Sequence, residues 1–459
     1  MPERDIIAVL SEGMPTLVRR HQVPGAQLAI RHAGRAELVV AGTREYGTGR
    51  PVTRDTAFPI GSISKFFTAT AAMVLVADGD LELDVPISDY LPDLDSACAP
   101  ITLRQLLSHT SGLGSGPTPG TRHTATLRRY VADQCRGENV VLAPGTGFSY
   151  SNSGFVVVGH LLEVVTGMDY WEALESILLH PLGITPTFVN DPRSGTPERP
   201  VAAGYSVNLA RHRTRPVDQS LAPAEAPAGG LATSAADLVT LAGLQLARAR
   251  PGLLPAGYAE QMRRAVPLAE PFGLATGWGL GLAIFAAGDT EWYGHDGNSN
   301  GTSCYLRFNP ALDLAIALTS NANTGLGVWQ DLFADLAAAG IPVERPAIQP
   351  ASPAPGSCLP ACVGTYANGE VRYEVRADDE GQLHLAVDGA VFARLICQAD
   401  LTFALHLPTS GQQLFCGRFL RDPATGAVDR IQVSGRLARR TAGASGDGHR
   451  PSRLGGVLT

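Results

Sequence analysis

A serine and a lysine three residues apart, Ser62 and Lys65, are the first residues whose types and spacing suggest chemistry. They precede an apolar stretch over 66–77 that predicts a buried helix, and their spacing puts both side chains on one face of it. A serine hydroxyl needs a neighbour that removes its proton, and a lysine in a water-poor cleft has a lowered pKa that suits this task. The pair therefore suggests acyl transfer through the serine.

A second group of polar residues, Tyr150, Ser151 and Asn152, lies in a loop rich in glycine and serine, directly before another predicted helix. A phenol can pass a proton between nucleophile and leaving group if nearby cations hold its pKa down. A carboxamide can both donate to a substrate amide and accept from it. The alternative is a tyrosine with its hydroxyl in water and an asparagine that caps the next helix.

A third group, His295, Asp296 and Gly297, lies at the end of a predicted strand. A glycine lets a substrate backbone lie close to such a strand, and a histidine can hydrogen-bond to a substrate or bias the site electrostatically. The alternative is an ordinary surface histidine in a turn.

Taken together, the three groups occur in the order S-x-x-K, Y-x-N and H-x-G. With this spacing the sequence resembles the penicillin-binding protein and class C β-lactamase superfamily from about residue 15 to 335. The stretches FPIGSISKFFTA, ITLRQLLSHTSGL, PGTGFSYSNSGF, HPLGI and AGGLATSAADL match it as well. The resemblance implies that Ser62 attacks a carbonyl and forms an acyl-enzyme, while Lys65 and Tyr150 share the general base and acid work and Asn152 holds the substrate amide.

The same resemblance assigns roles near the third group. The backbone N–H groups of Ser62 and Asn298 would form the oxyanion hole, and His295 and Gly297 would line the substrate-binding strand. Many β-lactamases of this superfamily have K-T-G where this chain has H-D-G. The missing lysine is a fixed positive charge that suits a β-lactam carboxylate, so the H-x-G form looks more like the esterases, D-stereospecific peptidases and peptide cyclases of this fold.

The elements that must position these residues predict an α+β fold. Residues 26–32 and 35–42 form a hairpin pattern, the segment 101–245 has a mainly helical pattern, and strand patterns return from 277 onwards. Strands at both ends with helices between them predict one antiparallel sheet, flanked by helices and beside a helical region. This is the β-lactamase/transpeptidase-like arrangement.

The length of 459 residues predicts a large and a small domain. We assign residues 1–343 to the serine acyl-transfer domain and the Pro- and Ala-rich segment 344–357 to a linker. Six short strand-like runs within 358–440 predict a small antiparallel β-barrel, and 441–459 has the composition of a flexible tail.

Composition and charge exclude several classes of partner. The net charge of −7 and the lack of a basic, aromatic-rich cluster argue against nucleic acid. The N-terminus lacks a signal-peptide pattern and the longest apolar run there is too short to span a bilayer, so we expect no membrane association and a cytoplasmic location.

The seven cysteines contain no C-x-x-C pair and are expected to be buried free thiols. His109 and His123 lack ligand spacing, so no metal and no cofactor is predicted.

The combination of the two predicted domains suggests which group attacks the acyl-enzyme. A penicillin-binding-protein-like domain with a lipocalin-like barrel is similar to stand-alone thioesterases that cyclise nonribosomal peptides head to tail. Such enzymes take a peptidyl thioester ending in a D-residue, which a peptide carrier protein can deliver. Arg436 in the barrel is then the candidate to grip the incoming peptide end, the alternative being a solvated strand arginine. Competing hypotheses are an esterase, a D-aminopeptidase-like or β-lactam hydrolase, and a binding protein without activity.

Overall fold

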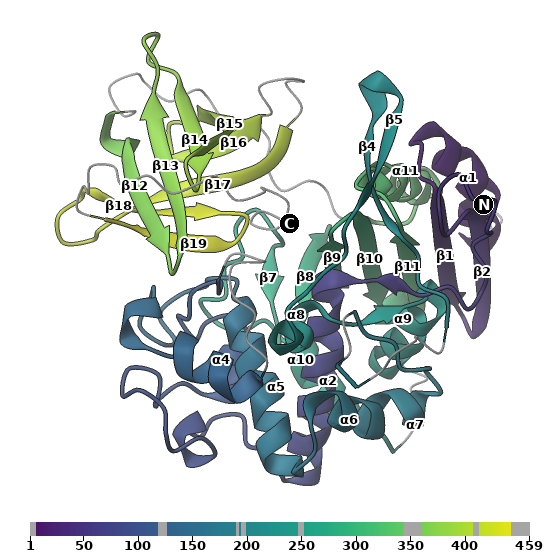
Figure 1. Cartoon of the computed structure of the whole chain (residues 1–459), viewed down its shortest axis with the longest axis horizontal. Helices are drawn as coiled ribbons and strands as arrows, with labels where there is room; N and C mark the ends of the chain where they lie inside the picture. Colours follow the sequence, from purple (N-terminus) through teal and green to yellow (C-terminus); the bar gives the residue numbers. More distant parts are fainter. Residues whose placement is uncertain are drawn as a thin grey trace.

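The computed structural model describes the chain in seven ranges and shows an α+β body followed by a β-barrel (Figure 1). The described residues are 6–117, 126–189, 192–193, 199–246, 252–343, 360–406 and 413–441. The predicted linker over 344–357 and the predicted tail after Thr441 lie outside them. The predicted fold class is confirmed.

The body is built on a seven-stranded antiparallel sheet with the order β2-β1-β11-β10-β9-β8-β7. Its first strand, β1, pairs with β11 near the end of the body, so the sheet is assembled from distant parts of the sequence as predicted. The bounds are β1 (Gly25–His32), β2 (Arg35–Gly42), β7 (Gly277–Trp278), β8 (Ala283–Ala287), β9 (Thr290–Ser299), β10 (Thr302–Asn309) and β11 (Leu314–Ser320).

The predicted hairpin is present, and its turn has the local geometry that the sequence suggests. Ala33 and Gly34 join β1 to β2 with φ of 49° and 81°. Positive φ at both central residues matches the twist of the flanking strands.

Helices cover both faces of the sheet, which explains why β1 is buried along most of its length. Helices α1 (Ile6–Arg20) and α11 (Gly325–Ala338) pack on one face, and α2 (Ser64–Asp78) and α9 (Ala235–Ala242) lie in the core on the other. As predicted, α2 is central, since its side chains from Ser64 to Leu75 are all buried. None of the helices in the described ranges is long and apolar enough to cross a membrane.

The segment 101–245 is mainly helical, as predicted, but it also contains strands. Besides α9, the α-helices of this segment are α3 (Leu103–Leu107), α4 (Leu127–Gln134), α5 (Asn152–Thr166), α6 (Tyr170–Leu174), α7 (His180–Leu182) and α8 (Ala226–Gly229). Helix α10 (Ala256–Arg263) follows it. The unpredicted strands are the ribbon β4 (Gly204–Asn208) and β5 (Arg213–Val217), and β6 (Ala232–Thr233), which pairs with β3 (Phe58–Pro59). These short strands are stabilised by tertiary contacts, which local pattern does not report.

The C-terminal domain is a closed antiparallel barrel in the order β12 to β19. Its strands are β12 (Gly364–Asn368), β13 (Val371–Ala377), β14 (Leu383–Val387), β15 (Ala390–Cys397), β16 (Thr402–His406), β17 (Gln413–Arg421), β18 (Val428–Val433) and β19 (Arg436–Arg440). The six predicted runs become eight strands because β12 was missed and the last run is split by a turn at Ser434 and Gly435. Pairing of β12 with β19 closes the barrel.

The cysteines in the described ranges are free, and all but the half-buried Cys416 are buried. This agrees with the prediction of buried thiols. Cys358 lies outside the described residues.

The barrel docks on the body through buried hydrogen bonds next to Tyr150. Asn368 accepts from the Ser115 backbone N–H at 2.6 Å, and its amide donates to the Leu437 carbonyl at 2.7 Å and to Ser149 Oγ at 3.3 Å. The Tyr150 N–H itself donates to the Gly435 carbonyl of the barrel at 3.0 Å. The barrel therefore holds the loop that carries one of the predicted catalytic groups.

We expect Asn368→Ala to lower the free energy of unfolding by about 2–4 kcal/mol, because it leaves buried partners on both domains unpaired. Urea unfolding followed by tryptophan fluorescence measures this. The control is Val391→Ala, a barrel residue that is 56% exposed, for which about 0.5 kcal/mol or less is expected. Equal stability of the Asn368 variant and the wild type would contradict the role of this side chain.

Candidate active site

Ser62 lies in a 3-10 turn over Gly61–Ile63, directly before α2, and not in the helix itself. The predicted proximity of Ser62 and Lys65 still results, because the turn continues directly into α2 and residues three apart lie on the same side of a helical segment. Lys65 Nζ donates to Ser62 Oγ at 3.0 Å. The first predicted pair is therefore assembled.

Two glycines let this turn lie against strand β9. A Cβ atom at Gly61, whose φ is 51°, would lie 2.2 Å from the Asn298 carbonyl oxygen, and a Cβ at Gly297 would lie 1.9 Å from that of Ile60. Neither distance is tolerated by a real side chain. The sequence suggested that Gly297 makes room for a substrate, whereas the structure shows that it makes room for the nucleophile turn.

Lys65 is fully buried and has two hydrogen-bond acceptors, Ser62 Oγ and the Ala228 carbonyl at 2.8 Å. Burial lowers its pKa well below the usual value, and the positive charge of Arg436 lowers it further, whereas Glu225 raises it. Burial also raises the pKa of Glu225 to about 7. The amine is thus suited to lose its proton and to act as a base toward Ser62.

The Tyr150 phenol lies close enough to the Ser62 hydroxyl for that group to lower its pKa, and Lys65 Nζ lies 4.9 Å from the centre of the Tyr150 ring. Hydroxyl, amine and phenol thus form one cluster. The expectation that cations hold the phenol pKa down is only partly met: burial raises it to about 12, against the smaller lowering effects of Ser62 and Arg436. A neutral phenol at neutral pH fits a proton carrier better than a primary base.

His109 positions Tyr150 in a way that the sequence did not reveal. Its carbonyl accepts from the Ser149 N–H at 2.9 Å, its Nδ1 accepts from the Ser151 N–H at 3.1 Å, and its ring lies 4.3 Å from the Tyr150 ring. Burial lowers the pKa of His109 well below the usual range, so the ring is neutral. His109 was considered only as a metal ligand, since nothing local shows which loop it contacts.

Asn152 is the first residue of α5 and lies two residues after Tyr150. Ser151 caps the helix by accepting from the Gly154 N–H at 3.0 Å, so the alternative interpretation of Asn152 as the cap is wrong. Asn152 Oδ1 is buried and has no hydrogen-bond partner within the described ranges. A substrate N–H group would satisfy it.

His295 presents a neutral hydrogen-bond acceptor. Its Nδ1 lies 2.6 Å from the Asp296 carbonyl oxygen, which only accepts, so the proton is on Nδ1 and Nε2 has a free lone pair. Nε2 is buried and unpaired among the described residues. Burial lowers the pKa to about 4, and Lys65 contributes in the same direction. This position therefore differs from a K-T-G lysine in charge and in hydrogen-bond polarity.

The edge of β9 beyond Gly294 is not paired with β8. The ladder between β8 and β9 ends at Gly294, while β10 continues to pair with β9 up to Ser299. Asn298 lies next to Gly61: a Cβ atom built at Gly61 would lie 2.9 Å from the backbone nitrogen of Asn298. The residue before Ser62 thus contacts Asn298, and an oxyanion hole formed by the backbone N–H groups of Ser62 and Asn298 stays a prediction.

Arg436 reaches this cluster from strand β19 of the barrel. Its guanidinium carbon lies 5.0 Å from the centre of the Tyr150 ring, and only 5% of the residue is exposed. The alternative of a solvated strand arginine does not hold. A buried cation at this place can bind an anionic or carbonyl oxygen of a substrate.

Arg436→Ala and Glu225→Gln are expected to shift the Lys65 pKa in opposite directions. The first removes a cation and raises the pKa; the second removes a carboxylate, charged above about pH 7, and lowers it. The acid limb of the acylation rate should move to higher pH in Arg436→Ala and to lower pH in Glu225→Gln. Because Lys65 is the only lysine in the sequence, ¹³C-lysine labelling gives one resonance that reports its pKa directly. Shifts of equal sign would contradict these electrostatics.

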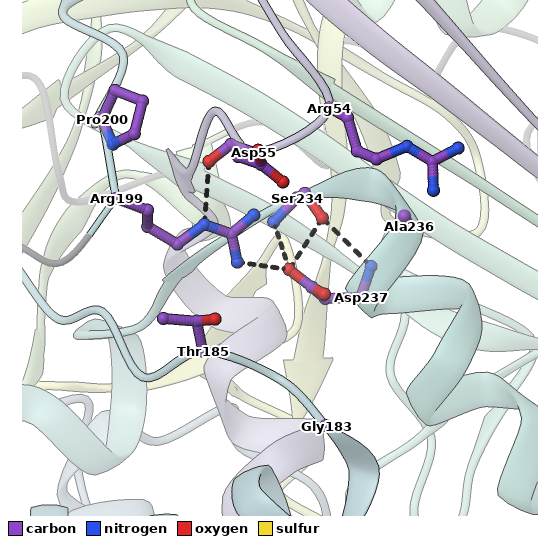
Figure 2. Close-up of a pocket in the computed structure, with 9 residues that line it drawn as sticks. All are labelled: Arg54, Asp55, Gly183, Thr185, Arg199, Pro200, Ser234, Ala236 and Asp237. Atoms are coloured by element: carbon purple, nitrogen blue, oxygen red, sulfur yellow. Dashed lines mark hydrogen bonds and ion pairs between the residues drawn. The ribbon is translucent and has the colours of Figure 1, made fainter.

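A separate pocket of about 410 Å³ lies away from this cluster (Figure 2). Arg199 and Asp237 form an ion pair of 2.7 Å in it, and Ser234 donates to the same carboxylate, so its central charges are mutually satisfied. None of the predicted site residues contributes to it. Its lining residues are Arg54, Asp55, Gly183, Thr185, Arg199, Pro200, Ser234, Ala236 and Asp237.

Metal-ligating side chains do not gather in the described part of the chain, where no group of three or more His, Cys, Asp or Glu side chains is arranged to hold an ion. His109 is used in the Tyr150 loop, and His123 lies outside the described residues.

The geometry agrees with the comparison to known proteins. The model of the family described as beta-lactamase matches residues 8–340. The chain belongs to this family. Penicillin-binding protein 4 of Amycolatopsis lactamdurans is 34% identical over 369 residues, which cover 77% of this chain and 96% of that protein. Esterase EstB of Burkholderia gladioli is 27% identical, covering 66% and 87%. The chain is accordingly a serine hydrolase of the β-lactamase superfamily.

Among solved structures, that of SurE is similar over both domains. It has a TM-score of 0.84 and 40% sequence identity, and the match covers 95% of this chain and 99% of SurE. SurE has also been solved with D-Leu, with a TM-score of 0.81. A D-amino acid amidase from Ochrobactrum anthropi, solved with D-phenylalanine, matches 73% of this chain with a TM-score of 0.61 and 26% identity.

Proposed function

We propose that this serine hydrolase is a peptidyl thioesterase that releases a nonribosomal peptide by head-to-tail amide formation, with hydrolysis as a side reaction. Ser62 attacks the thioester carbonyl, Lys65 takes the hydroxyl proton, and the thiol leaves with a proton passed through Tyr150. The N-terminal amine of the same peptide then attacks the ester on Ser62. Its proton returns to the serine as the C–O bond breaks and the amide forms.

The observation that carries this proposal is the buried Arg436 of the barrel above the Tyr150 ring. It ties the second domain to the reacting groups and offers a cation to the end of a long, folded-back substrate. A small ester would need no such second domain. The neutral Nε2 of His295 and the unpaired Oδ1 of Asn152 add acceptors for N–H groups, which a peptide supplies.

A D-residue at the acyl end is the proposed stereochemical preference. It is supported by SurE, solved with D-Leu, and by the name of the D-amino acid amidase, which shares the fold and has been solved with both D- and L-phenylalanine. A D-stereospecific amidohydrolase from Streptomyces with 29% identity and a TM-score of 0.57 points the same way. A cytoplasmic location and delivery by a peptide carrier protein stay predictions.

The second candidate function is an esterase or a D-stereospecific hydrolase. It is favoured by the similarity to EstB and to the D-amino acid amidase. In that case the Ser62 ester is resolved by water, and Arg436 holds a substrate carboxylate or carbonyl without guiding an amine.

Product analysis by mass spectrometry distinguishes the two. We would incubate the enzyme with a peptide N-acetylcysteamine thioester that ends in a D-residue and with its L-epimer. The proposal predicts a product that lacks the elements of water relative to the free acid, from the D-epimer only. Ser62→Ala serves as the blank for spontaneous hydrolysis and cyclisation. Linear acid alone from both epimers would favour the hydrolase.

A further inference from the structure

The antiparallel ribbon of residues 204–217, formed by β4 and β5, has no role in the chemistry above. It starts beside the catalytic edge: the Tyr205 N–H donates to the Gly301 carbonyl at 3.0 Å, three residues after Asn298. Asn323 binds it as well, accepting from the Val207 N–H at 2.6 Å and donating to the Val207 carbonyl at 3.2 Å. The base of the ribbon is thus fixed to the turn between β9 and β10 and to the segment that follows β11.

The far end of the ribbon is also held in place. Gln22, in the turn between α1 and β1, hydrogen-bonds through its Nε2 to His212 Nδ1 at 2.9 Å. Figure 1 shows the ribbon projecting from the body next to α11. Fixation at both ends favours a structural element over a mobile flap.

The two faces of the ribbon differ in composition. Tyr205 and Val207 are both only 5% exposed and face the body, as expected for alternate residues of a strand. On the other face, Arg213 lies opposite Asn208 and Arg215 lies opposite Ser206, and all four are exposed. Arg211 lies in the turn that joins β4 to β5 and is exposed as well.

These three arginines, Arg211, Arg213 and Arg215, form no ion pair with any residue in the described ranges, although other exposed arginines of the chain do. They place three positive charges on one short ribbon in a chain of net charge −7. Leu209 at its tip is 42% exposed, and Tyr46, whose N–H donates to the Tyr205 hydroxyl, is 57% exposed. A basic surface with exposed apolar side chains is suited to an acidic protein partner.

We propose that the face formed by Arg211, Arg213 and Arg215 is the docking surface for the acidic carrier domain that brings the peptidyl thioester to Ser62. This inference rests on the proposed function, because only a tethered substrate requires a carrier. The attachment of the ribbon next to Asn298 places the carrier beside the oxyanion side of the site. Electrostatic attraction then raises the rate of encounter while leaving the chemical step unchanged.

The test compares one peptide presented in two ways: as a thioester on a phosphopantetheinylated peptidyl carrier domain, and as an N-acetylcysteamine thioester. The variant Arg211→Glu/Arg213→Glu/Arg215→Glu should lose about tenfold or more in kcat/KM with the carrier-bound peptide, mainly through KM. It should stay within about twofold of wild type with the small thioester. The wild-type rate on the carrier-bound peptide should fall with added salt, and the variant should lose this dependence.

The matched control is Arg128→Glu/Arg129→Glu/Arg136→Glu, the same charge change on exposed arginines of and just after α4, which lies across the molecule from the ribbon in Figure 1. It should behave as wild type with both substrates. An unchanged rate of the ribbon variant on the carrier-bound peptide would overturn the proposal, as would an equal loss on both substrates. The proposal would also be overturned if the only effect of the ribbon variant were a loss of binding to an oligonucleotide. That result would assign the surface to nucleic acid. Failure of the proposed function is seen separately, in the wild-type products from the small thioester.

Discussion

Replacing Ser62 with alanine is expected to abolish covalent labelling by a fluorophosphonate and by a peptidyl thioester mimic. The Ser62 hydroxyl accepts a hydrogen bond from the Lys65 amine and lies beside the Tyr150 phenol, so the substitution removes the nucleophile from the cluster. We expect turnover to fall by about 10⁴-fold or more. Intact-protein mass spectrometry measures the labelling, and circular dichroism shows that the fold is retained.

Ser64 provides the matched control for this experiment. It lies two residues after Ser62, as the first residue of α2, but its Oγ is buried and accepts a hydrogen bond from the Leu231 N–H at 3.1 Å. Ser64→Ala should therefore keep the labelling, with a loss of stability of about 1–3 kcal/mol. Unchanged labelling of the Ser62 variant would disprove the assignment of the nucleophile.

Lys65→Met is expected to slow formation of the acyl-enzyme by about 10³-fold or more, because it removes the base and keeps the length of the side chain. Lys65→Arg should be similarly slow. A guanidinium keeps the positive charge but does not give up its proton in a protein. The rate of appearance of the acylated mass after rapid mixing measures both variants.

The pair of Lys65 variants separates a base from a structural cation. If Lys65 only stabilised the site by charge, the arginine variant would retain most of the acylation rate while the methionine variant would not. Binding of a non-reactive substrate analogue serves as a control for the fold of the site. Near wild-type acylation by either variant would rule out Lys65 as the base and leave Tyr150 as the remaining candidate.

The barrel contributes residues that contact the reacting groups. The carbonyl of Gly435 accepts from the backbone of Tyr150, and the next residue, Arg436, places its guanidinium over the Tyr150 ring. One turn of the second domain thus influences the position of the phenol and, through charge, the pKa of Lys65. Linear motifs in the first domain contain no information about this turn.

The sequence by itself determined the identity of the reacting groups and the main elements that carry them. The spacing of Ser62 and Lys65 and the apolar stretch after them are local properties, and they predicted the pair and the buried helix α2. The patterns of the hairpin β1–β2 and of most of the barrel strands are also local. Such features follow from backbone sterics and side-chain periodicity, which act over a few residues.

Only the tertiary structure decided the properties that depend on burial and on distant neighbours. The raised pKa of Tyr150, the neutral acceptor on His295 and the support from His109 arise where segments far apart in sequence exclude water together. The same holds for Gly297, whose need for a bare Cα comes from the approach of Ile60. Desolvation and close packing are set by the surrounding volume, and a linear pattern does not contain that volume.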